Sequence, residues 1–369
     1  MPDIALRLDG ISRHYGKVKA VDNLSIDIPS GAFVTLLGPS GCGKSTTLNL
    51  IAGLDRLDEG RILLGNDDIT FTPPNERRMA MVFQNYALYP HLNAYDNIAF
   101  GLKLQHRPAA EVRTRVNAVA AALDIIHLLN RKPGQMSGGQ QQRVALGRAL
   151  VKEPLVFLLD EPFSNLDAGL RSRMRTEVKH LHLKLGTTSV FVTHDQEEAM
   201  SLSDLIAVMR DGKVVQLGPT REIYRNPCDL YVATFVGKPK MSLVDGALER
   251  SNGEVTFVSP DLRISLGSPT ALGLHDGDWT NVALGVRAED VTVRFNGSAG
   301  SPVGSFGATV QLLEPIGSDT FVELASGDAT VVARVAPDVR LDIGQTVEAT
   351  IAPERIHVFD REGGQRIIH

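Results

Sequence analysis

Residues Ala32–Ile51, which read AFVTLLGPSGCGKSTTLNLI, decide the fold of the first part of this chain. The apolar run Ala32–Leu37 predicts a buried strand, and the run Thr47–Ile51 predicts a helix. The turn between them fits the pattern G-x-x-x-x-G-K-[ST], in which glycines let backbone N–H groups point inward at phosphate oxygens. The helix that follows presents its positive end to the same anion. The stretch therefore predicts a phosphate-binding loop in an α/β domain.

This loop supplies the candidate nucleotide-binding residues. Lys44 would place a positive charge at the β and γ phosphates, and Ser45 can offer its hydroxyl to Mg²⁺. Cys42 is expected to contribute its backbone N–H. The alternative, a Gly-rich turn without a ligand, is disfavoured by the strand and the helix on either side. The residues assigned to nucleotide binding in the loop are Gly38, Pro39, Ser40, Gly41, Cys42, Gly43, Lys44, Ser45 and Thr46.

Two acidic residues follow a second apolar strand, Leu155–Leu159, where it leaves the core. Asp160 suits Mg²⁺ in its second shell or through water, and Glu161 suits a general base that orients or activates water. Without further evidence, the simplest interpretation of two adjacent acidic residues after a strand is that they are exposed to solvent at its end and have no catalytic role. With the phosphate-binding loop upstream, the pair predicts nucleotide hydrolysis.

Length and composition restrict the class of protein. The 369 residues indicate two or three domains, and 43% hydrophobic with 22% charged residues is a globular balance. A net charge of -5 argues against a dedicated nucleic-acid binder. Two cysteines cannot make a disulfide framework. No secretory signal is visible in Met1–Asp9, and no apolar run approaches the roughly 20 residues of a membrane-spanning helix.

The charge is divided unevenly along the chain. Residues 241–369 contain nine Arg, no Lys and eighteen Asp or Glu, a net charge of -9, which leaves +4 for residues 1–240. Gly237 and Pro239, residue types that commonly mark turns and loops, lie close to this change in charge. We therefore predict two domains, residues 1–236 and 237–369.

The two parts also differ in their predicted elements. Residues 111–129 and 170–185 show the apolar spacing of amphipathic helices, the second ending at Gly186, and Ser189–Thr193 adds a strand. The second part shows short β-branched runs separated by Gly, Pro and Asp, which predict a small all-β barrel or sandwich. These runs are Thr256–Val258, Val291–Phe295, Ala308–Leu313, Thr320–Leu324, Ala329–Val335, Thr346–Ile351 and Ile356–Phe359.

Residues Met136–Arg143 read MSGGQQQR and resemble the signature motif of ABC-transporter ATPase subunits. They open a helix, so a serine hydroxyl and free N–H groups gather at its N-terminus as a second anion site. Taken alone, Ser-Gly-Gly is an ordinary helix cap. Met136 departs from the leucine common in the family, an apolar exchange from which we expect no functional loss. The residues assigned to the signature are Ser137, Gly138, Gly139 and Gln140.

The resemblance implies an α/β P-loop NTPase domain with a helical subdomain at about residues 86–152, followed by a C-terminal all-β, OB-like regulatory domain. It also implies ATP and Mg²⁺ as cofactors. Two ATP molecules would be sandwiched in a head-to-tail homodimer, with the phosphate-binding loop of one subunit facing the signature of the other.

Further residues match family landmarks in chain order. Gln84 matches the glutamine that touches Mg²⁺ or the attacking water, and His194 matches the switch histidine at the γ-phosphate. Tyr15 falls where the family stacks an aromatic ring on adenine. The alternative is a tyrosine at the edge of a strand that contacts no nucleotide. The loop that crosses the dimer interface is matched by Ser164, Asn165, Leu166 and Asp167. The implied catalytic residues are Lys44, Glu161 and His194, and the implied metal site consists of Ser45, Gln84 and Asp160.

Other stretches resemble importer ATPases of the maltose and glycerol-3-phosphate type. These stretches are Tyr86–His91, Thr193–Met200, Phe235–Met241, Gly285–Asp290 and Leu313–Thr320. The resemblance implies an ATP-hydrolysing motor at the cytoplasmic face of the cell membrane that imports sugars or sugar-like and glycerol-phosphate solutes. Its implied partners are two integral-membrane permease subunits and, through the complex, an extracytoplasmic solute-binding protein, with no nucleic acid.

Several alternatives remain open at the level of sequence. The solute can be a polyamine, iron or sulfate instead of a sugar. A soluble ABC ATPase outside transport is a second class, but such proteins usually fuse two cassettes or insert long coiled coils. The C-terminal domain can bind a metabolite or a regulatory protein, or it can simply strengthen dimerisation.

Overall fold

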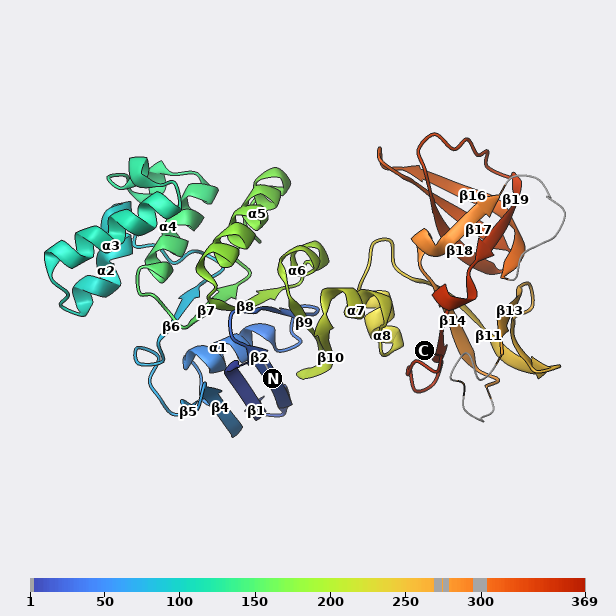
Figure 1. Cartoon of the computed structure of the whole chain (residues 1–369), viewed down its shortest axis with the longest axis horizontal. Helices are drawn as coiled ribbons and strands as arrows, with labels where there is room; N and C mark the ends of the chain where they lie inside the picture. The colour runs from blue at the N-terminus through green and yellow to red at the C-terminus, as the bar shows by residue number, and fades with distance from the viewer. Residues whose placement is uncertain (1–2, 269–273, 275–278, 295–303, 369) are drawn as a thin grey trace. The chain divides into compact units, whose positions relative to one another are not determined.

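The computed structural model describes residues 3–268, 274, 279–294 and 304–368. The chain divides into two compact units, Met1–Thr220 and Arg221–His369, which Figure 1 colours from blue to red along the sequence. The division therefore comes earlier than the predicted boundary after residue 236. The physical reason lies in Arg287, whose guanidinium donates to the carbonyls of Tyr224 (2.7 and 3.1 Å) and Val236 (2.9 Å) and so ties the segment before residue 237 to the second unit.

A six-stranded sheet forms the core of the first unit. Its strand order is β10-β9-β3-β8-β7-β6, parallel except for β10. Strands β3 and β8 are buried along their whole length, as expected for a sheet covered on both faces. The strands are β3 (Phe33–Leu37), β6 (Met79–Val82), β7 (Val156–Asp160), β8 (Thr188–Thr193), β9 (Leu205–Arg210) and β10 (Lys213–Pro219).

A second, antiparallel sheet of order β2-β1-β4-β5 belongs to the same unit. It pairs residues of the N-terminal hairpin with a strand that follows the first helix. This sheet was not predicted from the sequence. Its strands are β1 (Ile4–Tyr15), β2 (Val18–Pro29), β4 (Glu59–Leu64) and β5 (Asp67–Asp68).

Helices α2, α3 and α4, which fall within the helical subdomain predicted at about residues 86–152, share one hydrophobic cluster with parts of the sheet and of α5 (Figure 1). The predicted helix 111–129 is shorter than expected, because α3 ends at Ala122 and Asp124 takes a left-handed φ of 53°. Helix α5 ends as predicted at Gly186, whose φ is 61°. The helices are α1 (Lys44–Ala52), α2 (Ala94–Leu104), α3 (Ala109–Ala122), α4 (Gly138–Leu150), α5 (Ala168–Leu185) and α6 (Gln196–Leu202), with short 3₁₀ turns at Ile126–Leu128 and Pro133–Gln135.

The second unit begins with two short helices, α7 (Thr220–Arg225) and α8 (Leu230–Phe235), and continues as an all-β structure. Its two antiparallel five-stranded sheets have the orders β13-β12-β11-β14-β20 and β15-β19-β16-β17-β18. The strands are β11 (Ser242–Ser251), β12 (Glu254–Val258), β13 (Arg263–Gly267), β14 (Val282–Val286), β15 (Val291–Arg294), β16 (Ser305–Pro315), β17 (Thr320–Ser326), β18 (Ala329–Val335), β19 (Thr346–Ile351) and β20 (His357–Asp360), with 3₁₀ turns at Ala288–Asp290 and Pro353–Arg355.

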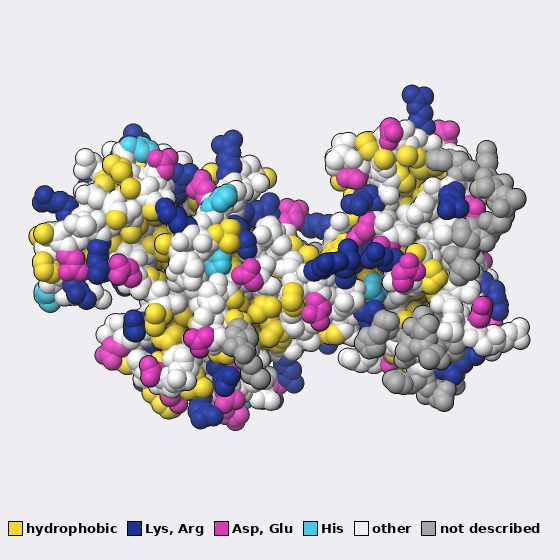
Figure 2. Space-filling model, in the orientation of Figure 1, with side chains coloured by type: hydrophobic (Ala, Val, Ile, Leu, Met, Phe, Trp, Pro, Cys, Tyr) yellow, Lys and Arg dark blue, Asp and Glu magenta, His cyan; other side chains and the backbone are white. Residues whose placement is uncertain are grey.

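Each of the seven predicted β runs overlaps one of these strands, and Ile356 precedes β20. Phe295, the last residue of one run, lies outside the described residues. Among the described part of the chain, no helix is long and apolar enough to cross a membrane. On the face drawn in Figure 2, basic and acidic side chains are interspersed over the first unit.

Candidate functional site

The phosphate-binding loop has the backbone that its glycines allow. It follows the buried end of β3, and Gly41 and Gly43 adopt φ values of 83° and 103°, which L side chains rarely adopt. A Cβ at Gly43 would collide with the Ala20 carbonyl oxygen, and one at Gly38 would lie 2.5 Å from the Met209 carbonyl oxygen. The loop therefore needs glycine both for its dihedral angles and for its close packing.

Lys44 and Ser45 begin α1 at the end of this loop. The Lys44 side chain is buried, and its Nζ donates to the carbonyls of Gly38 (2.9 Å) and Pro39 (2.8 Å). Ser45 Oγ donates to Asp160 Oδ1 at 3.0 Å. Burial raises the pKa of Asp160, and the neighbouring Glu161 charge raises it further, whereas the Ser45 hydrogen bond and the Lys44 charge lower it. The structure thus joins the hydroxyl and the carboxylate that were predicted for a metal.

Glu161 and His194 lie at the carboxyl ends of the neighbouring parallel strands β7 and β8. Glu161 Oε1 is 3.2 Å from His194 Nδ1. Glu161 has a left-handed φ of 41°, and Ser164 Oγ donates to its carbonyl at 3.0 Å. A non-glycine residue in this region is uncommon and marks a position where the surrounding structure fixes the backbone. The predicted base and the predicted switch histidine are therefore direct neighbours.

The signature residues form the N-terminal cap of α4. Ser137 Oγ accepts from the Gln140 N–H at 3.4 Å, and Gln140 Oε1 accepts from the Ser137 N–H at 3.0 Å, which is a capping box. A Cβ at Gly139 would lie 2.9 Å from Leu170 Cδ1, so glycine allows the close approach of α4 and α5. The contacts described for these residues reach the start of α5, not the phosphate-binding loop.

The predicted interface loop connects β7 to α5. Asn165 Nδ2 donates to the Gln84 carbonyl at 3.0 Å, so this loop and the exposed Gln84 are held together. Leu166 is buried, and Asp167 Oδ1 accepts from the Leu170 N–H at 2.9 Å as the N-cap of α5. The loop is thus fixed at both of its ends.

Tyr15 ends strand β1 and is 48% exposed. Its hydroxyl donates to Asp55, and the Arg13 guanidinium carbon lies 4.7 Å from the centre of its ring. An exposed aromatic ring can stack on a base. The role of Tyr15 at adenine stays a prediction.

Mg²⁺ requires oxygen ligands, and it is usually held by one or two protein groups together with substrate phosphates. The Ser45 hydroxyl, the Asp160 carboxylate and the Gln84 amide offer donors of this type, and Ser45 and Asp160 are already in contact. Within the described ranges, no group of three or more His, Cys, Asp and Glu side chains could hold a metal by itself. The donors present therefore fit Mg²⁺ bound jointly with phosphate oxygens.

Two polar groups that support the site were missed by sequence reasoning. The buried Glu198 Oε2 accepts from Thr193 Oγ1 at 2.6 Å beside His194, and the buried Asn97 binds the backbone of the loop after Gln84. The only signal for Asn97 was an amide on an otherwise apolar helix face. Glu198 had no comparable signal, because its partners come from other elements.

Comparisons with known proteins agree with this geometry. The model of the ABC transporter family matches residues 21–164, and the TOBE domain model matches residues 284–359. The trehalose/maltose import ATP-binding protein MalK of Thermococcus litoralis is 43% identical over 98% of this chain and 99% of its own length. The sn-glycerol-3-phosphate import ATP-binding protein UgpC of Salmonella typhi is 41% identical over 98% of this chain and 99% of its own.

A further relative and a solved structure point the same way. The sulfoquinovosyl glycerol transport ATP-binding protein SmoE of Agrobacterium fabrum is 41% identical over the whole of both chains. The dimeric post-hydrolysis structure of the ATP-binding cassette MJ0796, bound to ADP and Pi, aligns with a TM-score of 0.52 at 33% identity, covering 58% of this chain and 99% of the cassette. The predicted resemblance and fold class are thereby confirmed. The chain belongs to the ABC transporter ATP-binding proteins, a family of ATP-hydrolysing subunits, and carries a C-terminal TOBE domain.

Proposed function

We propose that this chain is the motor subunit of an ABC importer for sugars or for sugar-like and glycerol-phosphate solutes. The observation that carries the proposal is the match at 41–43% identity, along nearly the whole chain, to relatives named as import ATP-binding proteins for trehalose/maltose and for sn-glycerol 3-phosphate. The match includes the second unit, which the isolated cassettes lack. A non-sugar cargo is the alternative that the test below addresses.

The chemistry is assigned to residues at the carboxyl ends of the sheet. The loop Gly38–Thr46 binds the phosphates through backbone N–H groups, and Lys44 stabilises negative charge on the transferring group. Glu161 accepts a proton from the attacking water or orients it, and His194, 3.2 Å away, holds the γ-phosphate side of the site. The short distance supports a shared task for these two side chains.

Ser45 and Asp160 would hold Mg²⁺ together with Gln84. When bound, this ion would neutralise phosphate charge during transfer. The 3.0 Å contact between Ser45 Oγ and Asp160 Oδ1 supports this assignment, because it keeps both oxygen donors beside Lys44.

The assembly is proposed as a homodimer in which Ser137, Gly138 and Gly139 contact the ATP held by the partner subunit. The dimeric state of the MJ0796 cassette supports this arrangement. ATP would then favour the closed dimer through contacts that exist only while the γ-phosphate is present. The region around Gln84–His91 would form the groove that receives short cytoplasmic helices of the two separate permease subunits at the cytoplasmic face of the membrane. An extracytoplasmic binding protein would deliver the solute.

The test uses the substitution Glu161→Gln and growth on defined solutes. A strain that lacks this chain is grown on trehalose, maltose or sn-glycerol 3-phosphate as its only carbon source. The wild-type chain is expected to restore growth on at least one of them, and Glu161→Gln is expected not to. Restoration by Glu161→Gln would contradict the assigned catalysis. A strain that grows normally on all three without the chain would contradict the cargo class.

A further inference from the structure

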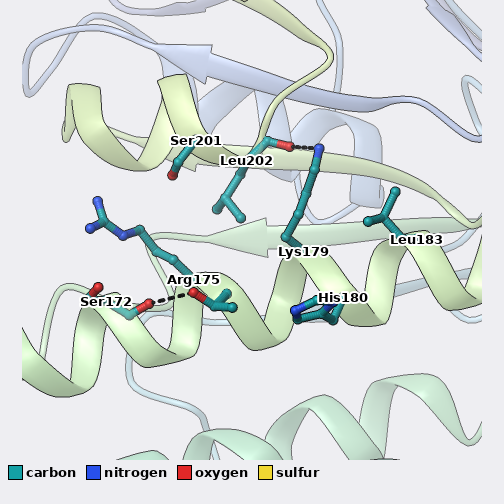
Figure 3. Close-up of a pocket in the computed structure, with 8 residues that line it drawn as sticks. Ser172, Arg175, Lys179, His180, Leu183, Ser201 and Leu202 are labelled. Atoms are coloured by element: carbon teal, nitrogen blue, oxygen red, sulfur yellow. Dashed lines mark hydrogen bonds between the residues drawn. The ribbon is translucent and has the colours of Figure 1, made fainter.

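Three of the cationic side chains of helix α5, Arg171, Arg175 and Lys179, follow one another at intervals of four residues. This spacing places them on one face of the helix. Arg175 Nη1 lies 3.3 Å from Glu197 Oε2, and Lys179 Nζ donates to the Leu202 carbonyl at 2.6 Å. Figure 3 shows the Lys179 contact reaching from α5 to the end of α6, beside a groove between the two helices. Helix α6, which follows His194, is therefore fastened to α5.

Arg171 differs from the other two cations because it also contacts the interface loop. Its Nη2 donates to the Leu166 carbonyl at 3.3 Å. Its Nη1 lies 3.6 Å from Asp195 Oδ2, and its Nε lies 3.9 Å from Glu198 Oε1. One planar guanidinium thus connects the loop Ser164–Asp167 with the segment that contains His194.

The Arg171 Nε is buried, and within the described part of the chain it has no hydrogen-bond partner. Its separation from Glu198 is too long for a hydrogen bond. A buried donor without a partner is unfavourable, so a small shift that closes this gap would be stabilised. The structure shows the open arrangement of this contact, and the unpaired Nε would favour a closed one.

Glu198 carries the connection onward to His194. It is 3% exposed, and its Oε2 accepts from Thr193 Oγ1 at 2.6 Å. Thr193 Oγ1 in turn accepts from the Asp195 N–H at 2.9 Å. These two bonds connect the residues on both sides of His194 to the Glu198 carboxylate, so a displacement of this carboxylate would be transmitted to the His194 backbone.

We propose that Arg171 and Glu198 are positioning residues that couple the interface loop to His194. When a partner subunit moves the Leu166 carbonyl, Arg171 follows, and the Glu198–Thr193 pair aligns His194 for hydrolysis. The inference deepens the proposed function and rests on it, because it assumes that Ser164–Asp167 lies at a dimer interface and that His194 acts in hydrolysis. Neither positioning residue touches the reacting atoms.

The test measures kcat and KM for ATP hydrolysis by the full-length chain. Arg171→Met and Thr193→Val are each expected to lower kcat by roughly tenfold or more and to change KM less than about twofold, because misplacement of a catalytic group acts on the chemical step. Thr193→Ser keeps the hydroxyl and is expected to recover most of kcat. Glu198→Gln keeps an acceptor for Thr193 but removes the charge that faces Arg171, so it is expected to behave like Arg171→Met.

Arg173→Met is the matched control. Arg173 is exposed on the same helix, and the structure gives it no hydrogen bond or ion pair with any described residue. It is expected to keep wild-type kcat. A thermal unfolding curve for each variant separates loss of folding from loss of positioning, and Glu198→Gln keeps the proposal testable if Arg171→Met does not fold.

A second comparison tests whether Arg171 affects hydrolysis through His194. In a His194→Ala background, Arg171→Met is expected to cause little further loss of kcat. An equal loss in both backgrounds would overturn the proposal, as would folded Arg171→Met and Glu198→Gln chains with wild-type kcat. Wild-type kcat in His194→Ala alone would instead overturn the proposed function.

Discussion

Gly43 shows how strictly the phosphate-binding loop constrains a single residue. Its φ of 103° and the Ala20 carbonyl leave no room for a Cβ. We expect Gly43→Ala to weaken ATP binding by roughly tenfold or more, because relief of the clash must distort the backbone that donates to the phosphates. The measurement is titration with a fluorescent ATP analogue.

The matched control for this prediction is Gly65→Ala. Gly65 also has a positive φ, 59°, but nothing lies within 4 Å of the position that a Cβ would take there. Its variant is expected to bind the analogue like the wild type. Equal affinity of the Gly43→Ala and wild-type chains would contradict the role given to this loop.

The stability of the second unit is expected to depend on pH because this unit contains the buried side chain of His357. Burial, with the nearby charges of Arg366 and Arg287, lowers the pKa of His357 from 6.5 to about 4, and its buried Nδ1 has no hydrogen-bond partner within the described ranges. Between these pKa values the unfolded chain binds a proton that the folded chain does not, so stability is lost as the pH falls from 6.5 towards 4. The full shift corresponds to about 3 kcal/mol in the free energy of unfolding.

The single tryptophan, Trp279, packs against the core of the second unit and can report its unfolding in urea. The wild-type transition is expected to move to lower urea concentration between pH 6.5 and pH 4.5. In His357→Phe, which carries no titrating group at this position, the movement is expected to be smaller. The same movement in both chains would show that other groups cause it.

From the residues alone, candidate site residues could be proposed only where neighbours in the sequence carry the chemistry, whereas Gln84 and His194 were proposed from the family resemblance. Lys44 and Ser45 are adjacent in one motif, and Asp160 and Glu161 follow one strand. Arg171 and Glu198 could not be predicted, because their contacts join α5 to α6 and depend on tertiary packing.

At the scale of elements, apolar periodicity predicted which segments form helices and buried strands better than it predicted where these elements end. Strands β3, β7 and β8 and helix α5 follow apolar patterns that packing alone produces. The long helix expected at 111–129 stops at Ala122, because Asp124 turns the chain with a left-handed φ. The long strands β1 and β2 escaped prediction, and register shifts interrupt their pairing.

Helix α2 holds the loop that contains Tyr89 through one side chain. The buried Asn97 accepts from the Tyr89 N–H at 2.8 Å and donates to the carbonyls of Tyr89, Leu92 and Asn93. Asn97→Ala would leave several of these buried backbone groups unpaired. We expect it to lower the free energy of unfolding of the first unit by about 3 kcal/mol, measured by urea denaturation followed by far-UV circular dichroism.

Thr114→Ala is the control for this prediction. Thr114 Oγ1 donates to the Ala110 carbonyl at 3.0 Å on the exposed surface of α3. Loss of an exposed bond is expected to change stability by less than about 0.5 kcal/mol. A similar, small effect of both substitutions would show that Asn97 does not hold the loop.

At the scale of the whole molecule, residues 1–240 and residues 241–369 differ in charge, although the second unit begins earlier, at Arg221. The net charge of -9 belongs to residues 241–369, and the site residues all lie in residues 1–240, which carry +4. An excess of positive charge suits a unit that binds polyanionic nucleotide. The overall charge of -5 conceals this difference, which appears only when the charges on the two sides of residue 240 are counted separately.

The proposed homodimer predicts that two inactive chains can restore one another. Lys44→Ala removes the charge at the phosphates, and Gly138→Asp places a negative charge at the signature, where it would repel the γ-phosphate of ATP. Each variant alone is expected to be inactive.

If the signature acts on the partner's ATP, a mixed dimer has one site with both an intact loop and an intact signature. The two variants are co-expressed in equal amounts, or unfolded, mixed in equal amounts and refolded together. About half of the dimers are then mixed, and each mixed dimer has one intact site out of two. The mixture is therefore expected to recover up to about a quarter of wild-type ATPase activity. If each signature instead served the loop of its own chain, every site in the mixture would be defective, and no activity would return.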